Sequence, residues 1–168
     1  MDIFSDFWSW AWERHHNELS WYIRPFFILP YIYFAYRRSR TGLLLTVIAL
    51  LTSMFWFPKP ETADPQVQQF LQAEIDYLTG EWSVSKVLLS SLVPITMLFL
   101  AAAFWKRSWK YGILIINLIA IMKSVWSVYA DGSGIAVLVP ALVGLLVCNL
   151  VVIGAYLFVR KRKRNVSA

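Results

Sequence analysis

Apolar residues form long runs along this chain, and the short intervals between the runs hold most of the charged side chains. Five runs approach or reach the length that a helix needs to cross the roughly 30 Å hydrocarbon core of a bilayer. These runs cover residues 19–36, 41–57, 84–105, 111–130 and 135–159. The pattern predicts an all-α integral membrane protein with five transmembrane helices, organised as a single membrane domain over residues 1–168.

The first segment, residues 1–18, carries too many charges to cross a bilayer. At helical spacing its aromatic residues, including Phe4, Trp8 and Trp12, gather on one side, whereas Asp2, Asp6 and Glu13 lie opposite. This arrangement is typical of an amphipathic helix that lies along the membrane surface.

A second polar interval, residues 58–83, separates the second and third apolar runs and contains five of the ten acidic residues. Asp64 is a suitable N-cap, and Pro65 fits the first helical position. Gly80 is expected to end the helix in a left-handed turn. The interval therefore predicts an amphipathic helix over residues 65–79.

Composition supports the membrane class. Of the 168 residues, 58% are hydrophobic and only 15% are charged, against about 25% charged in an average soluble protein. The aromatic content of 17% suits a chain whose rings lie at the lipid–water boundary. The single cysteine, Cys148, excludes an intrachain disulfide and a thiolate metal cluster.

The distribution of charge predicts the orientation. Eleven of the sixteen Lys and Arg residues fall after the first and third runs and in a basic tail, residues 160–168, whereas all ten acidic residues fall on the opposite side. Positive residues stay in the cytoplasm, so we expect the N-terminus outside, the C-terminus inside and an acidic cap outside an inner or plasma membrane. The lipid bilayer is the expected partner, and nucleic acid is not, because the basic residues flank apolar runs and form no basic domain.

Glu74 is the most informative residue of the polar interval. On a helical wheel it lies in the middle of the apolar face of residues 65–79, whereas Asp76 points away. A carboxylate on such a face is costly unless it is paired or protonated. The structural interpretation is a cap on the helical bundle. The functional interpretation is an ion-pair network in an outer vestibule with the three cations placed inside runs, which are Arg24, Lys86 and Lys123.

Asn117 belongs to a polar stripe on the fourth run, together with Ala120, Ser124 and Ser127. Small and hydroxyl residues in one stripe usually indicate close helix packing. The alternative is a hydrated path that leads past Lys123. Asn149 in the fifth run lies at a similar depth, and we expect it to hydrogen-bond Asn117.

The segment from Glu13 to Glu18 suggests two further interpretations. Glu13 and His16 are three residues apart, a spacing that carboxylate–histidine metal sites use, but a further ligand would be needed. His15 interrupts an apolar stripe, as Glu74 does, so these two residues can instead form a pH-sensitive pair. The preferred interpretation has no metal and no cofactor.

Three classes of function are compatible with these patterns. The leading one is the transport or conduction of a small ion or proton-coupled solute through the charged vestibule, which uses Glu74, Arg24, Lys86, Lys123, His15 and Asn117. The second is a non-catalytic accessory or assembly protein that binds another membrane subunit or a second copy of itself. A metal-dependent membrane enzyme is the least favoured.

Overall fold

Every regular element in the described part of the chain is a helix. The computed structural model describes residues 3–62, 64–131 and 135–166, with the backbone alone over residues 126–131, 135–137, 163 and 166. The elements in order are α1 (Ile3–His15), α2 (Glu18–Ile23), the 3₁₀ helix η1 (Arg24–Phe27), α3 (Ile28–Tyr36), α4 (Arg40–Thr52), the 3₁₀ helix η2 (Ser53–Phe55), α5 (Pro65–Thr79), α6 (Val84–Trp105), α7 (Trp109–Asp131) and α8 (Ile135–Val166).

Helix α5 has the bounds that its sequence predicts. The Asp64 side chain accepts a hydrogen bond from the Gln66 amide at 2.7 Å and caps the helix, with Pro65 in the first turn. The expected left-handed turn at Gly80 is wrong, because this glycine is extended, with φ −69° and ψ 171°. The Lys86 ammonium instead donates to the Gly80 and Glu81 carbonyls and binds this end of the helix.

Within the described residues, two helices are long and apolar enough to cross a membrane, rather than the five that we expected. They are Val84–Trp105 and Leu138–Arg162, and only 22% and 17% of an apolar 18-residue stretch in each are buried inside the protein. The core helix of a soluble protein would be mostly buried, so these two helices turn their apolar side chains outward. The full five-span topology stays a prediction.

The other three predicted spans differ from long unbroken helices for separate reasons. Residues 19–36 are divided, because Pro25 lacks an amide hydrogen and the chain forms η1 between α2 and α3. Residues 41–57 yield a shorter apolar helix, Arg40–Phe55. Helix α7 has the length but includes Lys123, and its last side chains lie outside the described part.

The last helix also ends later than the predicted span, which covered residues 135–159. Helix α8 continues to Val166, so the basic residues that were expected in a tail after 159 form its last turns. The Asp-Gly-Ser-Gly sequence of residues 131–134 predicts a tight turn before the last helix, but it lies largely outside the described residues, since only the backbone of Asp131 is described there.

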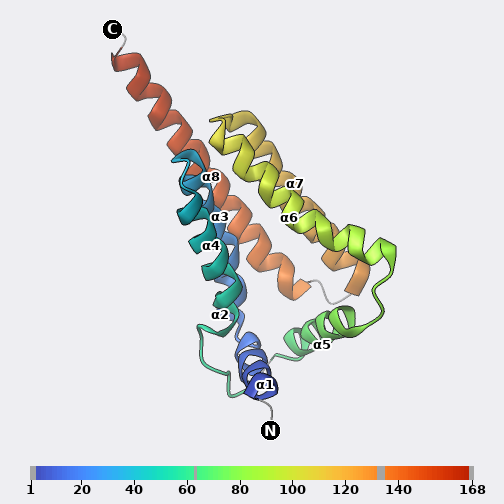
Figure 1. Cartoon of the computed structure of the whole chain (residues 1–168). Coiled ribbons are helices and arrows are strands. Elements are labelled where there is room, and N and C mark those ends of the chain that lie inside the picture. Colours follow the sequence, from blue (N-terminus) through green and yellow to red (C-terminus); the bar gives the residue numbers. More distant parts are fainter. Residues whose placement is uncertain (1–2, 63, 132–134, 167–168) are drawn as a thin grey trace.

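The main hydrophobic core lies toward the end of the bundle where α8 finishes. Its buried members are Tyr31, Ile32, Ala35, Leu100, Phe104, Ile116 and Val152. The helices lie close together at this end and spread toward the other, where α5 lies between α1 and the start of α6 (Figure 1). The bundle is therefore tightly packed at one end and more open at the other.

Two similar turns close the packed end. Arg38 after α3 and Arg107 after α6 both have φ 57°, a left-handed conformation in which glycine is usual. The two arginines also join the hairpins to each other. Arg38 Nε donates to the Trp105 carbonyl at 3.2 Å, and the Arg107 guanidinium lies 5.2 Å from the centre of the Tyr36 ring.

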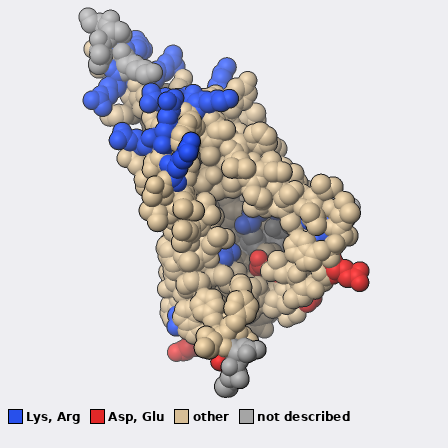
Figure 2. All heavy atoms as spheres, viewed as in Figure 1, with Lys and Arg blue, Asp and Glu red and all other residues tan. Residues whose placement is uncertain are grey.

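Charge is separated between the two ends of the molecule. Figure 2 shows most Lys and Arg side chains at the end where α8 finishes, and Asp and Glu side chains at the opposite end, over α1 and α5. The same view shows a hollow between α5 and the spread helices, with both basic and acidic atoms inside it.

Candidate functional site

The corner between α1 and α2 fixes His15. Asn17 caps α2 by accepting from the Leu19 amide, and its side-chain nitrogen donates to the Pro58 carbonyl at 2.9 Å. Trp21 Nε1 donates to the His15 carbonyl at 3.1 Å. The imidazole lies between two indoles, with ring centres 5.5 Å from Trp12 and 6.1 Å from Trp21. Only 2% of His15 is exposed, so its position is set by this aromatic corner.

Helix α5 packs on the same corner through its first two turns. Val67 and Leu71 are buried against Trp21, and the Phe70 ring meets the Trp21 ring edge to face at 5.1 Å. One turn after Phe70, the Glu74 carboxylate reaches His15, with Oε2 3.7 Å from Nε2. The structure thus brings Glu74 to His15, the pair that was one of the two interpretations of the segment from Glu13 to Glu18.

Arg24 enters the site from the broken first span. It begins η1 directly before Pro25, and Pro25 packs against Gly144 of α8, where a Cβ atom would overlap the proline ring. The Cys148 thiol donates to the Pro25 carbonyl at 3.4 Å. Helix α8 therefore supports the break that places Arg24.

Two cations lie near Glu74 without touching it. Arg24 and Lys123 both act electrostatically on its carboxylate, but neither has a carboxylate at ion-pair distance among the described residues. Arg24 Nε is buried and has no hydrogen-bond partner in this part of the chain. The site thus joins residues from α1, η1, α5 and α7.

The pKa of Glu74 reflects these neighbours. Burial alone would raise it, but the close contact with His15 and the nearby basic groups Arg24 and Lys123 outweigh burial and lower the pKa below 4.5. Glu74 is therefore ionised at neutral pH.

Burial has the opposite consequence for His15 and lowers its pKa below 6.5, against the effect of Glu74. The neutral tautomer with hydrogen on Nε2 directs that hydrogen toward Glu74 and leaves Nδ1 without one. Nδ1 is buried without a partner, so a proton there would find no acceptor. This environment favours neutral His15 at pH 7.

Lys86 lies elsewhere. Its ammonium is 4.6 Å and 4.8 Å from the centres of the Tyr77 and Trp82 rings, in addition to its bonds to the end of α5. The structure thus gives Lys86 a role in holding α5 to the start of α6. It does not bring this cation to Glu74 at ion-pair distance within the described residues.

Asn117 is part of a separate contact between α7 and α8. Its Nδ2 donates to Asn149 Oδ1 at 3.0 Å, and Asn149 Nδ2 donates back at 3.3 Å. The expected hydrogen bond between them is confirmed. Each amide also donates to a carbonyl four residues earlier in its own helix, so the pair is internally satisfied.

The residues of the metal interpretation have other partners. Glu13 forms an exposed ion pair with Lys59 at 3.1 Å, and His16 Nδ1 lies 2.9 Å from the Trp12 carbonyl. Within the described ranges no three His, Cys, Asp or Glu side chains come together as a metal site would require.

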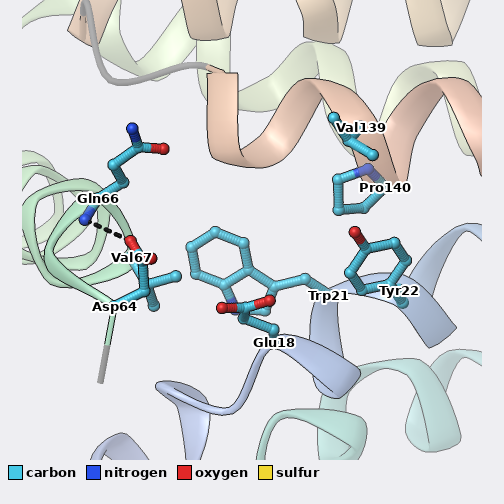
Figure 3. Close-up of a pocket in the computed structure, with 8 residues that line it drawn as sticks. All are labelled: Glu18, Trp21, Tyr22, Asp64, Gln66, Val67, Val139 and Pro140. Atoms are coloured by element: carbon cyan, nitrogen blue, oxygen red, sulfur yellow. Dashed lines mark hydrogen bonds between the residues drawn. The ribbon is translucent and has the colours of Figure 1, made fainter. Parts of the chain in front are cut away.

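A cavity of about 220 Å³ lies beside the charged site (Figure 3). Its walls come from α2, the start of α5 and α8, and the residues are Glu18, Trp21, Tyr22, Asp64, Gln66, Val67, Val139 and Pro140. Trp21 belongs to both places, since its ring also contacts His15. No periodic pattern in the sequence indicates this cavity, because three elements far apart in the chain form it.

Comparison with protein-family models, curated proteins and solved structures finds no match to this chain. The function must therefore be argued from the residues themselves.

Proposed function

We propose that this chain is an integral membrane protein whose outer charge cluster admits a small ion or a proton-coupled solute for transport. The observation that carries the proposal is the convergence of His15, Arg24, Glu74 and Lys123 from four elements at the open end of the bundle. Ionisable residues within membrane segments are expensive to keep and usually serve function.

The membrane location rests on two features of the fold. Helices α6 and α8 expose long apolar surfaces that suit lipid tails. Basic residues gather at one end and acidic residues at the other (Figure 2), as the positive-inside rule requires. In the proposed topology five spans cross an inner or plasma membrane, with α1 and α5 on the outer surface.

The packing of the two shorter apolar segments supports five spans rather than two. The broken segment α2–η1–α3 and the short helix α4 pack side by side, and Pro25 contacts α8 directly. Proline and irregular turns are tolerated within a membrane where neighbouring helices surround them. The break at Arg24 is then the place where the first span opens toward the charged site.

The test is flux into proteoliposomes, followed with a pH-sensitive dye and with labelled small solutes. Lys123→Met should abolish flux of the transported species while the protein remains folded and monodisperse, because it removes a charge from the entry site. Lys59→Met, at an exposed pair with Glu13, serves as the matched control and should leave flux unchanged. Absence of flux in the parent protein, or equal flux in Lys123→Met, would contradict transport.

The accessory-subunit alternative makes a different prediction. A stable membrane partner should then co-purify at fixed stoichiometry, and proteoliposomes that contain this chain alone should show no flux. A homo-oligomer would instead give one species of a defined multiple mass.

A further inference from the structure

The charges around Glu74 do not balance. Arg24 is a permanently cationic guanidinium near this site, and Lys123 is a second basic group there. Glu74 is the carboxylate that acts on both of them. His15 contacts Glu74, and His16 acts on His15. With His15 neutral, the basic side chains of the described cluster outnumber its single carboxylate.

Hydrogen-bonding capacity is also unfilled. Arg24 Nε is buried with no acceptor, and the guanidinium has no carboxylate at ion-pair distance in the described residues. A guanidinium is a planar donor that matches oxygen anions and binds them strongly where water is scarce. The missing partner at Arg24 is thus an acceptor with negative charge.

The site is open enough to receive such a partner. Many protein atoms surround Lys123, yet its side chain keeps accessible surface, as a side chain that lines a hollow does. Glu74 itself is 37% exposed, although it reaches the buried His15. Figure 2 shows the hollow with basic and acidic atoms inside it.

We infer that the hollow binds a small monovalent anion, a carboxylate or a halide, between Arg24 and Lys123, and that Glu74 partly neutralises this site in the free protein. This inference rests on the proposed transport function and names its substrate class. A cation is disfavoured, because the Arg24 guanidinium and the neighbouring Lys123 would repel it.

Glu74 gives the site its coupling to protons. An anion that enters while Glu74 is ionised meets a like charge, whereas protonated Glu74 removes that repulsion. One bound proton and one bound anion leave the net charge of the site unchanged. His15 acts in the same direction, because its protonation at lower pH adds a positive charge beside the anion.

The test is equilibrium binding of ¹⁴C-labelled acetate to the purified full chain at pH 7.5, at fixed ionic strength in buffers with bulky sulfonate anions. We expect one acetate per chain and displacement by chloride. Glu74→Gln, which imitates the protonated carboxyl group, should bind acetate about tenfold more tightly than the parent does. Arg24→Gln should weaken binding about tenfold or more.

Asp76→Asn is the matched control, because Asp76 lies on the exposed side of α5 and accepts a hydrogen bond from Gln72. It should bind acetate as the parent does. The inference is overturned if Glu74→Gln weakens binding, if Asp76→Asn has the same effect as Glu74→Gln, or if folded parent protein binds neither acetate nor chloride.

The outcomes for anion binding and for transport are separable. Specific acetate binding without flux would support the anion site and contradict transport. Flux of a cation that Lys123→Met abolishes, without acetate binding, would support transport and overturn the anion site.

Discussion

At the scale of single residues, the contact between His15 and Glu74 couples the outer helices to pH. The imidazole is buried between Trp12 and Trp21, and Glu74 is the acidic group that reaches it in the described structure. A protonated imidazole would need an acceptor at Nδ1, and none is present among the described residues. Burial therefore disfavours the protonated imidazole, although its attraction to Glu74 opposes this effect.

Stability should accordingly fall as pH drops below 6.5. The pKa of His15 is lower in the folded chain than in the unfolded chain, so the unfolded chain binds more protons in this window and acid favours it. Glu74, whose pKa is also lowered, adds a second loss as pH falls below 4.5. Thermal unfolding in detergent from pH 7.5 to 5.0 would measure the first effect. His15→Gln should reduce this dependence of thermal stability on pH. An equal dependence in the variant and the parent would show that His15 is not its cause.

A second residue-scale prediction concerns the Asn117–Asn149 pair. Asn117→Leu removes both hydrogen bonds across the helices and leaves Asn149 with one side-chain acceptor unpaired. We expect a loss of about 1 kcal/mol in the free energy of unfolding. The double variant Asn117→Leu, Asn149→Leu should recover part of this loss, which chemical unfolding in mixed micelles can measure. A double variant with the summed loss of two single variants would show that the pair is not coupled.

Residue directions were largely predictable from sequence, as were the Asn117–Asn149 and His15–Glu74 pairs, but the partners of Lys86 were not. The helical wheel of α5 placed Glu74 inward, and the structure agrees. The wheel could not show that Lys86 bends back to the Gly80 carbonyl, because that contact depends on the extended turn between α5 and α6. Likewise, Arg24 and Lys123 come near Glu74 only through the tertiary arrangement.

At the scale of elements, capping residues and prolines determined how well the helices could be predicted. Asp64 and Pro65 fixed the start of α5. Arg38 and Arg107 have a left-handed backbone conformation that the sequence does not indicate, since glycine is the residue expected in that conformation. A proline such as Pro25 usually kinks a helix, and the structure shows a full 3₁₀ turn there, supported by α8.

The contact between Pro25 and Gly144 predicts that position 144 does not tolerate a larger residue. Gly144→Ala places a Cβ atom against the Pro25 ring, so η1 or α8 must shift. We expect a loss of about 1–3 kcal/mol, the usual effect of overpacking, together with weaker function through displaced Arg24. Gly154→Ala is the matched control, because no atom lies within 4 Å of its added Cβ. Equal stability of the two variants would contradict this packing.

At the scale of the whole molecule, charge separation was predictable and shape was not. The positions of Lys and Arg along the chain predict the basic end that Figure 2 shows. The count carries no information on helix tilt, which depends on how Tyr31, Leu100, Phe104 and their neighbours interlock. The position of the core toward the basic end, and hence the hollow at the other, came only from the structure.

The proposed topology predicts opposite accessibility at the two ends. In a Cys148→Ser background, Thr79→Cys at the end of α5 should react with a membrane-impermeant maleimide in intact cells. Asn165→Cys near the end of α8 should react only after permeabilisation. Both positions are exposed in the structure, so burial would not explain a difference. Labelling of both from outside would contradict the orientation.

The contacts of Arg38 with Trp105 and of Arg107 with Tyr36, at the basic end, have a mechanical consequence. They fasten α3 to α6 at one end, so α6 resembles a lever pivoted there. Its 22 residues span about 33 Å. A tilt of about 5° at the pivot moves the far end by about 3 Å, roughly the diameter of a water molecule. The side chains at the far end of α6, beside the hollow, can thus move toward or away from α5 by that distance while the packed end stays almost unchanged.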